Sequence, residues 1–423
     1  MRMSHVGWNL AGLSLPLLVA AVTVPQLIGR LGHERFGLLA LAWSLIGYAG
    51  VLDLGIGRAL TQMVSRLRGE GNLSAIPNAL VTAGRITLIA GLAGGGLIVL
   101  AALCGADTWI HAATTPRKEI TNAILLLAIA LPVQAMSATY RGLNEAFLNF
   151  KGISLLRIGL GVVNFGGPYL VTLYTTELPW LVATLVASRL IALAVFRWLA
   201  YSCLEDWKTK KTAAAYSATS AKSLFSFGGW ITVSSVVSPM LIQADRFLIA
   251  SVLSASAVTA YVLPYEVVVQ SLILVGAISS VIFPTMSKLM REEPNGWQRY
   301  FRRWLLIVAG MMFLVCAAIA LLLPGVLQLW VGNDLQPKSI LVGQILCIGV
   351  FANSIGSMYY ALLHAKGRAD ITAKLHVIEF PLFVTTLFFL VHIFGITGAA
   401  WAWVGRMVFD AVALAWISRT TRA

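Results

Sequence analysis

The residues that could do chemistry in this sequence are charged side chains inside long apolar stretches. The segment SPMLIQADRFLIASVLS, residues 238–254, is apolar almost throughout and still places Asp245 beside Arg246. Arginines inside a membrane can bind phosphate oxygens, and carboxylates there can carry protons or bind sodium. The apolar stretches contain as many basic as acidic side chains. Residues that only form ion pairs with each other must therefore be distinguished from residues that bind a ligand. The cations are Arg58, Arg85, Arg189, Arg246 and Arg406, and the acids are Asp53, Asp245, Glu266, Glu379 and Asp410.

The composition indicates that helices crossing a membrane position these charges. Hydrophobic residues make up 58% of the chain and charged residues 11%, whereas soluble proteins contain about 25% charged residues. Apolar runs of about 18 residues or more are typical of spanning helices. We therefore expect an all-α polytopic membrane protein with no soluble domain. Its predicted spans are 6–28, 36–63, 78–104, 120–141, 152–174, 179–201, 225–252, 257–287, 302–323, 339–363, 370–392 and 396–417.

The distribution of lysine and arginine predicts the orientation of these spans. Most basic residues fall in the connections on the side of the N-terminus, and the other side holds only Arg30, Arg35, Arg117, Lys118 and Lys338. Because basic loops stay in the cytoplasm, both termini are predicted to be cytoplasmic. The net charge of +14 reflects this asymmetry and an attraction to anionic membrane lipids, so no nucleic-acid partner is expected.

An internal repeat divides the predicted helices into two lobes. Gly7-Trp8 matches Gly229-Trp230 at a shift of 222 positions, and Ser65-Arg66-Leu67 matches Ser287-Lys288-Leu289 at the same shift. An even number of helices separates the equivalent points, so the repeat is parallel. The predicted domains are a six-helix lobe at 1–203, a cytoplasmic linker at 204–222 and a second six-helix lobe at 223–423. Transporters of this plan bind substrate between their lobes and alternate access by rocking.

Enzyme chemistry has little support in the sequence. The cysteines and histidines are scattered, so neither a metal site nor another cofactor is predicted. A membrane polymerase or glycosyltransferase would need a substantial exposed loop, whereas the longest connection predicted outside the cytoplasm is the short stretch around GADTWIHAATTPRKE. Short loops favour a transporter over a polysaccharide polymerase or a glycosyltransferase.

Helix geometry predicts ion pairs for several of the charges. At about 1.5 Å per residue, Arg406 and Glu379 both lie about 15 Å deep, from opposite sides. Asp410 lies one helical turn from Arg406 on the same face. Asp53 could pair with Arg85 across a helical hairpin. Arg246 could pair with Glu266, since adjacent residues of a helix cannot face each other, and Asp245 would then face the cleft or a neighbour's polar group. Each of these residues also remains a candidate for substrate or ion binding.

Arg189 has no acid at its depth in the fifth or sixth predicted span. An unpaired arginine there costs at least about 2.5 kcal/mol, so we expect it to face water, carbonyl groups or a substrate phosphate, or to pair with a distant helix. Arg58 follows Gly55 and Gly57, which allow close backbone approach, and could contact phosphate or reach lipid head groups. Arg141 and Arg157, at cytoplasmic helix ends, could capture an anionic substrate.

Three stretches give the chain a family resemblance. The stretches are FGGWITVSSVVSPMLIQADRFLIASVLSASAVTAYVLPYEVVVQ at 227–270, LGHERFGLLALAWSLIGYAGVLDLGIGRALTQMVSRL at 31–67 and RGLNEAFLNFKGISLLRI at 141–158. They resemble the corresponding parts of Wzx-type oligosaccharide flippases. These belong to the polysaccharide transport family of the MATE-like MOP superfamily. The chain lacks the two further helices of lipid II flippases and the acid that many MATE exporters carry in the first helix, so the oligosaccharide branch fits better.

The resemblance implies a flippase of the bacterial inner membrane. Its substrate would be an undecaprenyl diphosphate-linked oligosaccharide, moved from the cytoplasmic to the periplasmic leaflet by alternating access. A polysaccharide polymerase and a chain-length regulator are the implied partners. Transport could be coupled to H⁺ or Na⁺ through the acids named above, or could run downhill as the product is consumed. A drug or cation exporter on the same fold is the main alternative.

Overall fold

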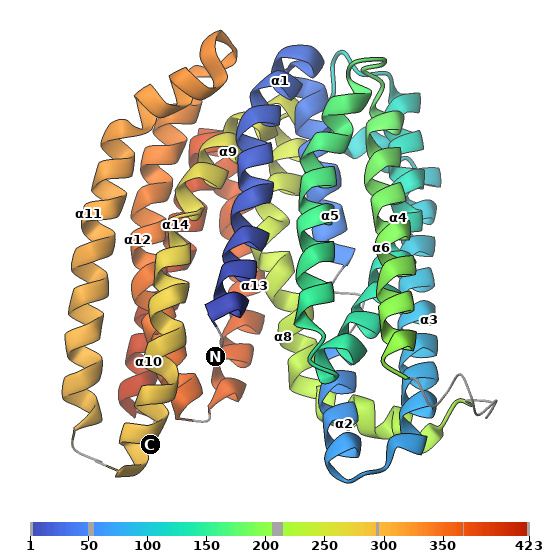
Figure 1. Cartoon of the computed structure of the whole chain (residues 1–423). Coiled ribbons are helices and arrows are strands. Elements are labelled where there is room, and N and C mark those ends of the chain that lie inside the picture. Colours follow the sequence, from blue (N-terminus) through green and yellow to red (C-terminus); the bar gives the residue numbers. More distant parts are fainter. Residues whose placement is uncertain (1–2, 50–54, 205–214, 293–295, 367, 421–423) are drawn as a thin grey trace. The chain divides into compact units, whose positions relative to one another are not determined.

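A computed structural model describes residues 3–49, 55–204, 215–292, 296–366 and 368–420 (Figure 1). The described part is helical, with short 3-10 turns and no strand. The helices pack into two compact units, Met1–Met240 and Leu241–Ala423. Asp53, one of the candidate acids, lies outside the described residues, as does most of the predicted linker at 204–222. The predicted lobe boundaries at 203 and 223 therefore remain a prediction.

Unit 1 is built around α4. Its helices are α1 (Met3–Ala49), α2 (Ile56–Gly69), α3 (Ile76–Leu103), α4 (Arg117–Ala146), α5 (Phe150–Val171) and α6 (Leu178–Ser202), followed by the first part of α8 (Ala218–Val252). Helix α4 packs against α1, α2, α3, α5 and α6 (Figure 1). Small residues permit this crowding. A Cβ atom on Gly142 would collide with the carbonyl oxygen of Gly57 in α2, so glycine is needed where these two helices meet.

Unit 2 has a corresponding central helix, α12. Its helices are the remainder of α8, then α9 (Ala255–Val269), α10 (Leu272–Glu292), α11 (Trp297–Val331), α12 (Pro337–Ala365), α13 (Ala369–Phe394) and α14 (Ile396–Thr420). Helix α12 packs against α9, α10, α11, α13 and α14. Its buried face is rich in small residues, as α4's is.

The two units repeat each other helix by helix. Helix α4 begins at Arg117 and α12 at Pro337, a separation close to the 222 positions between Gly7 and Gly229. By the same shift α3, α5 and α6 correspond to α11, α13 and α14, and each pairing of α4 in unit 1 has its counterpart around α12 in unit 2. This agreement in both sequence position and packing supports the parallel repeat.

The predicted spans need two corrections. Ten helices are long and apolar enough to cross a membrane, counting described residues only. The predicted spans 6–28 and 36–63 correspond to the two helical segments of α1, which are separated by a non-helical kink at Gly32 (φ 72°), but the second segment ends at Ala49, before α2 begins. The span predicted at 257–287 is divided into α9 and α10. Helix α8, predicted as the span 225–252, is present but is not among the ten.

Glycines mark both breaks around the second predicted span. Gly32 has a positive φ, which glycine adopts without steric cost, and it separates the two helical segments of α1. Gly55, in a left-handed conformation, precedes α2, and α2 alternates polar and apolar faces instead of being apolar all round. Hydropathy alone therefore joined a membrane helix to an amphipathic one.

Candidate functional site

A polar pocket within unit 1 brings together three of the predicted binding arginines. It has a volume of about 340 Å³ and lies among α4, α5 and α6. Arg141 comes from α4, Arg157 from α5 and Arg189 from α6, and Gln134 and Asn164 add amide groups. Guanidinium groups suit phosphate oxygens, and amides suit sugar hydroxyls, so the lining fits a phosphorylated glycan.

The three arginines stand at different depths along the helices. Arg141 is five residues before the end of α4 at Ala146, about 8 Å along the axis. Arg157 lies seven residues after Phe150, about 10 Å from the beginning of α5. Arg189 precedes the end of α6 at Ser202 by about 20 Å. Helices α4 and α6 end, and α5 begins, on the same side of the unit. The three arginines therefore lie at successive depths, from that side toward the middle of the helices.

Arg189 is held by an amide and not by an acid. Its Nη2 donates to Asn164 Oδ1 at 3.0 Å, and its buried Nε has no hydrogen-bond partner. Trp43 of α1 donates through Nε1 to the Asn164 carbonyl oxygen at 3.2 Å and packs on the Phe165 ring, which fixes this part of α5. The guanidinium therefore keeps its charge and unused donor capacity at the pocket wall.

The pocket stays cationic because its arginines are poorly neutralised. Arg141 contacts Glu145 one turn away, with Nε and Oε1 3.6 Å apart and both side chains partly exposed, and such pairs contribute little. Among the described residues, Arg157 and Arg189 form no ion pair. The predicted alternative for Arg189, a pair with an acid of a distant helix, is not found in that part of the chain.

Helices α13 and α14 of unit 2, which correspond to α5 and α6, carry an acidic cluster instead of a cationic pocket. Ligand atoms of His376 and Glu379 on α13 and of Asp410 on α14 all lie within 4.8 Å of one another. Arg406 Nε lies 3.9 Å from Glu379 Oε2, which confirms the predicted encounter, and Arg406 Nη1 donates to the Leu241 carbonyl at 3.0 Å. The Glu379 side chain is 1% exposed, and neither of its oxygens accepts a hydrogen bond from a described residue.

Asp245 and Arg246 belong to a neighbouring cluster of unit 2, which Arg406 also approaches. Arg246 Nη2 lies 2.7 Å from Glu266 Oε1, which confirms the predicted pair between α8 and α9. Asp245 is buried and accepts the Tyr261 hydroxyl at 2.7 Å, together with the backbone N–H of Arg246. The Arg246 guanidinium also lies 5.3 Å from the centre of the Tyr265 ring. Every charge here has a partner, so this cluster fastens α8 to α9.

The remaining predicted residues do not join either site. Arg58, near the start of α2, and Arg85, in α3, are exposed, and neither lines the pocket of unit 1. Because Asp53 is outside the described residues, its predicted pair with Arg85 is not tested. Arg246, Arg406 and the acids of unit 2 lie in the other unit from the three pocket arginines.

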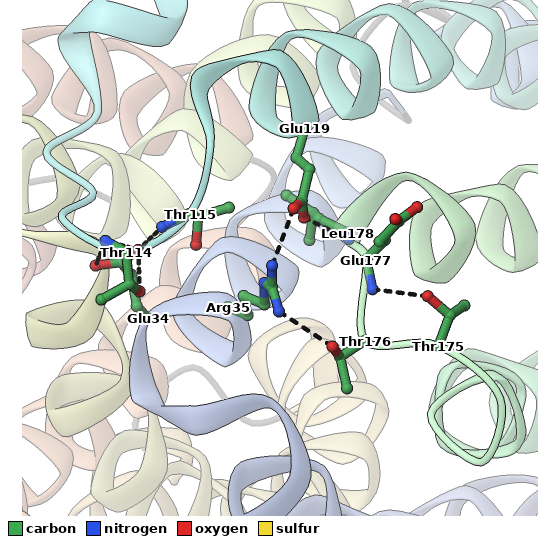
Figure 2. A network of polar contacts seen from close by, with 9 residues as sticks. All are labelled: Glu34, Arg35, Thr114, Thr115, Glu119, Thr175, Thr176, Glu177 and Leu178. Atoms are coloured by element: carbon green, nitrogen blue, oxygen red, sulfur yellow. Dashed lines mark hydrogen bonds and ion pairs between the residues drawn. The ribbon is translucent and has the colours of Figure 1, made fainter.

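A polar network at the other end of unit 1 was not anticipated (Figure 2). Just after the α1 kink, Glu34 accepts the backbone N–H groups of Ala113 and Thr115, each at 2.7 Å. Arg35 Nη2 lies 2.9 Å from Glu119 Oε1, and Glu119 Oε2 accepts the N–H of Leu178 at the start of α6. The adjacent acid and base in LGHERFG, after a glycine, were the available signal. The network ties α1, α4 and α6 into one body.

Comparison with known proteins gives a consistent family. The model of a family described as "Polysaccharide biosynthesis protein" matches residues 4–290. A Shigella flexneri protein named "Putative O-antigen transporter" is 29% identical over 414 residues, which cover 97% of this chain and 96% of that protein. "Lipopolysaccharide biosynthesis protein WzxC" of Escherichia coli K12 is 23% identical over 391 residues, covering 91% of this chain and 74% of that protein.

Solved structures support the fold. An inward-facing multidrug resistance MATE family transporter of the MOP superfamily superposes with a TM-score of 0.74 at 14% identity, and 97% of each chain is covered. A MOP superfamily transporter from Pyrococcus furiosus gives a TM-score of 0.60 at 16% identity, over 97% of this chain and 92% of that one. These likenesses establish a MATE-like arrangement of helices.

Proposed function

Because this chain belongs to the polysaccharide biosynthesis protein family, we propose that it moves an undecaprenyl diphosphate-linked oligosaccharide from the cytoplasmic to the periplasmic leaflet. It is a multi-pass membrane transporter with the fold of the MOP superfamily. The proposal adds the substrate, the direction and a location in a bacterial inner membrane, with both termini cytoplasmic. The two lobes would alternate access by rocking against each other, without catalysis. A polymerase and a chain-length regulator would take over the product.

The observation that carries this proposal is the cationic pocket of unit 1. A diphosphate in a membrane needs several guanidinium groups, because its desolvation must be offset by charge-assisted hydrogen bonds. Arg157 and Arg189 supply unneutralised donors, and Arg141 lies nearer the helix ends that we assign to the cytoplasm. The three arginines at successive depths would let the diphosphate pass from the cytoplasmic end toward the middle of the helices, while Gln134 and Asn164 contact sugar hydroxyls.

Deletion of the protein tests this function directly. Cells lacking it should accumulate a lipid-linked oligosaccharide on the cytoplasmic leaflet, because synthesis continues while translocation stops. Its amount and its leaflet can be measured by lipid extraction and by accessibility to a membrane-impermeant glycosidase. Reintroducing the wild-type chain is the control. If no such lipid accumulates and sensitivity to cationic drugs rises, the alternative function as a drug or cation exporter is the correct one.

We infer that ion coupling, if transport uses it, runs through His376, Glu379 and Asp410 in unit 2. The carboxyl groups of buried Glu379 and half-buried Asp410 repel each other at this distance unless a proton or a cation lies between them. Arg406 is near both acids but approaches Glu379 only at the limit of an ion pair, 3.9 Å. The oxygens of Glu379, which accept no hydrogen bond from a described residue, can accept a proton or ligate Na⁺. Binding or release would change the packing between α13 and α14.

Replacing Glu379 by glutamine is expected to slow transport and to remove its dependence on the driving ion gradient. Reconstituted vesicles with an imposed proton or sodium gradient would measure the rate. Asp370→Asn is the matched control, because Asp370 is a carboxylate on the same helix that pairs with Arg368 and Lys374 near the membrane surface. Unchanged gradient dependence in Glu379→Gln would exclude this cluster from coupling.

A further inference from the structure

A second cationic cavity lies in unit 2, at the end where α11 begins and where α12 and α14 end. Its volume is about 830 Å³. Three cations line it, Arg302 from α11, Lys366 after α12 and Arg419 from α14, and none of the lining residues is acidic. The function proposed above makes no use of this cavity, because the three arginines of the substrate pocket are in unit 1.

Lys366 is built into the wall of the cavity. Its Nζ donates to the Ser418 carbonyl oxygen at 3.0 Å and lies 5.1 Å from the centre of the Trp297 ring. Burial lowers the pKa of the Lys366 ammonium, so an anion in the cavity would favour its charged form. Arg302 and Arg419 are exposed, and neither forms an ion pair with a described residue. The cavity thus has one anchored cation and two that can adjust to a ligand.

Below the cations the cavity becomes apolar. Phe301, Leu305 and Leu306 of α11 and Leu362 of α12 line this part. Leu306 lies nine residues after Trp297, about 14 Å along α11. The outer face of α11 continues with the exposed side chains of Phe313 and Leu314. A polar cationic end above an apolar wall that opens to lipid matches a phospholipid, with its phosphate at the end and its acyl chains along the helix.

We propose that this cavity binds an anionic phospholipid of the cytoplasmic leaflet. The basic-residue asymmetry assigns this end of the helices to the cytoplasm, where anionic head groups attract arginine and lysine. The beginning of α11 at Trp297 adds the positive end of the helix dipole. Trp297 suits the interfacial depth. The bound lipid would join the ends of α11, α12 and α14 on the cytoplasmic side.

Lipid retention by the purified full-length protein tests this proposal. The protein would be equilibrated with mixed vesicles or micelles of phosphatidylglycerol and phosphatidylcholine, and bound lipid measured by native mass spectrometry. The wild type should retain phosphatidylglycerol selectively. The double variant Arg302→Gln/Arg419→Gln should bind it about tenfold more weakly. Arg299→Gln/Arg303→Gln is the matched control, since both residues are exposed cations of α11 outside the cavity lining, and it should retain the lipid.

Four results would overturn the assignment. The first is equal loss of lipid in the control, and the second is unchanged binding in Arg302→Gln/Arg419→Gln. Third, competition by inorganic phosphate at equal concentration would identify a site for free anions. Fourth, preferential displacement by a polyprenyl diphosphate would identify a second substrate site. The Arg189 variants described below leave this cavity intact, so failure of the lipid site and failure of the proposed transport function can be told apart.

Discussion

Replacing Arg189 by glutamate is expected to abolish transport of the lipid-linked oligosaccharide. The substitution places a carboxylate opposite the substrate diphosphate and removes the donor that Asn164 holds in position. Loss of one charge-assisted hydrogen bond costs about 1.5–3 kcal/mol, and repulsion adds to that cost. Complementation of the deletion strain would show accumulation of the lipid intermediate at the level of the strain without the protein.

Conservative and distant variants separate binding from folding in this experiment. Arg189→Lys keeps the charge but loses the planar fork, so we expect partial transport. Arg66→Glu makes the same charge change at an exposed ion pair of unit 1 and should transport normally. Membrane levels of all three variants must equal those of the wild type. Normal transport by Arg189→Glu at wild-type levels would remove Arg189 from the substrate site.

Replacing Arg246 by methionine is expected to destabilise unit 2 strongly. The change leaves Asp245, 1% exposed, without its adjacent cation and leaves Glu266 unpaired. Glu266 is 47% exposed and can be solvated, so most of the loss comes from Asp245, a buried carboxylate left without its cation, which costs about 3–5 kcal/mol. The unfolding midpoint of the purified protein in detergent should fall, and less protein should reach the membrane. Arg368→Met, which breaks an exposed pair, should leave the midpoint nearly unchanged.

A second substitution should recover part of this loss. Asp245→Asn in the Arg246→Met background removes the uncompensated charge, and the asparagine oxygen can still accept the Tyr261 hydroxyl. Such partial recovery is expected only for residues that interact. If Arg246→Met instead keeps the wild-type unfolding midpoint and loses transport, Arg246 contacts the substrate and is not a structural clamp.

The helices could largely be predicted from sequence because lipid imposes one requirement on every span. Backbone groups in hydrocarbon must be satisfied within the helix, so apolar length marks the segment. Two boundaries were predicted wrongly. The span predicted at 36–63 runs past the end of α1 at Ala49 into α2, an amphipathic helix that follows Gly55. At residues 270–271 a short break between α9 and α10 carries no charge or proline to mark it.

The charged residues were only partly predictable. Depth along a helix was enough to pair Arg246 with Glu266 and to bring Arg406 near Glu379, because both pairs join neighbouring or similarly deep positions. The pocket that unites Arg141, Arg157 and Arg189 depends on the rotation of three helices about their axes. Depth says nothing about that rotation. The Glu34 network could not be predicted from the sequence, because the partners of Glu34 are backbone N–H groups of a loop distant in sequence, which no side-chain pattern indicates.

Binding of a lipid-linked sugar by the purified protein tests most directly whether the pocket of unit 1 holds a diphosphate. Affinity would be compared for a polyprenyl diphosphate-linked and a polyprenyl monophosphate-linked glycan, in the wild type and in Arg157→Gln/Arg189→Gln. The wild type should prefer the diphosphate, and the variant should lose that preference, with diphosphate affinity falling roughly tenfold or more. An unchanged preference in a folded variant would contradict the role assigned to these arginines.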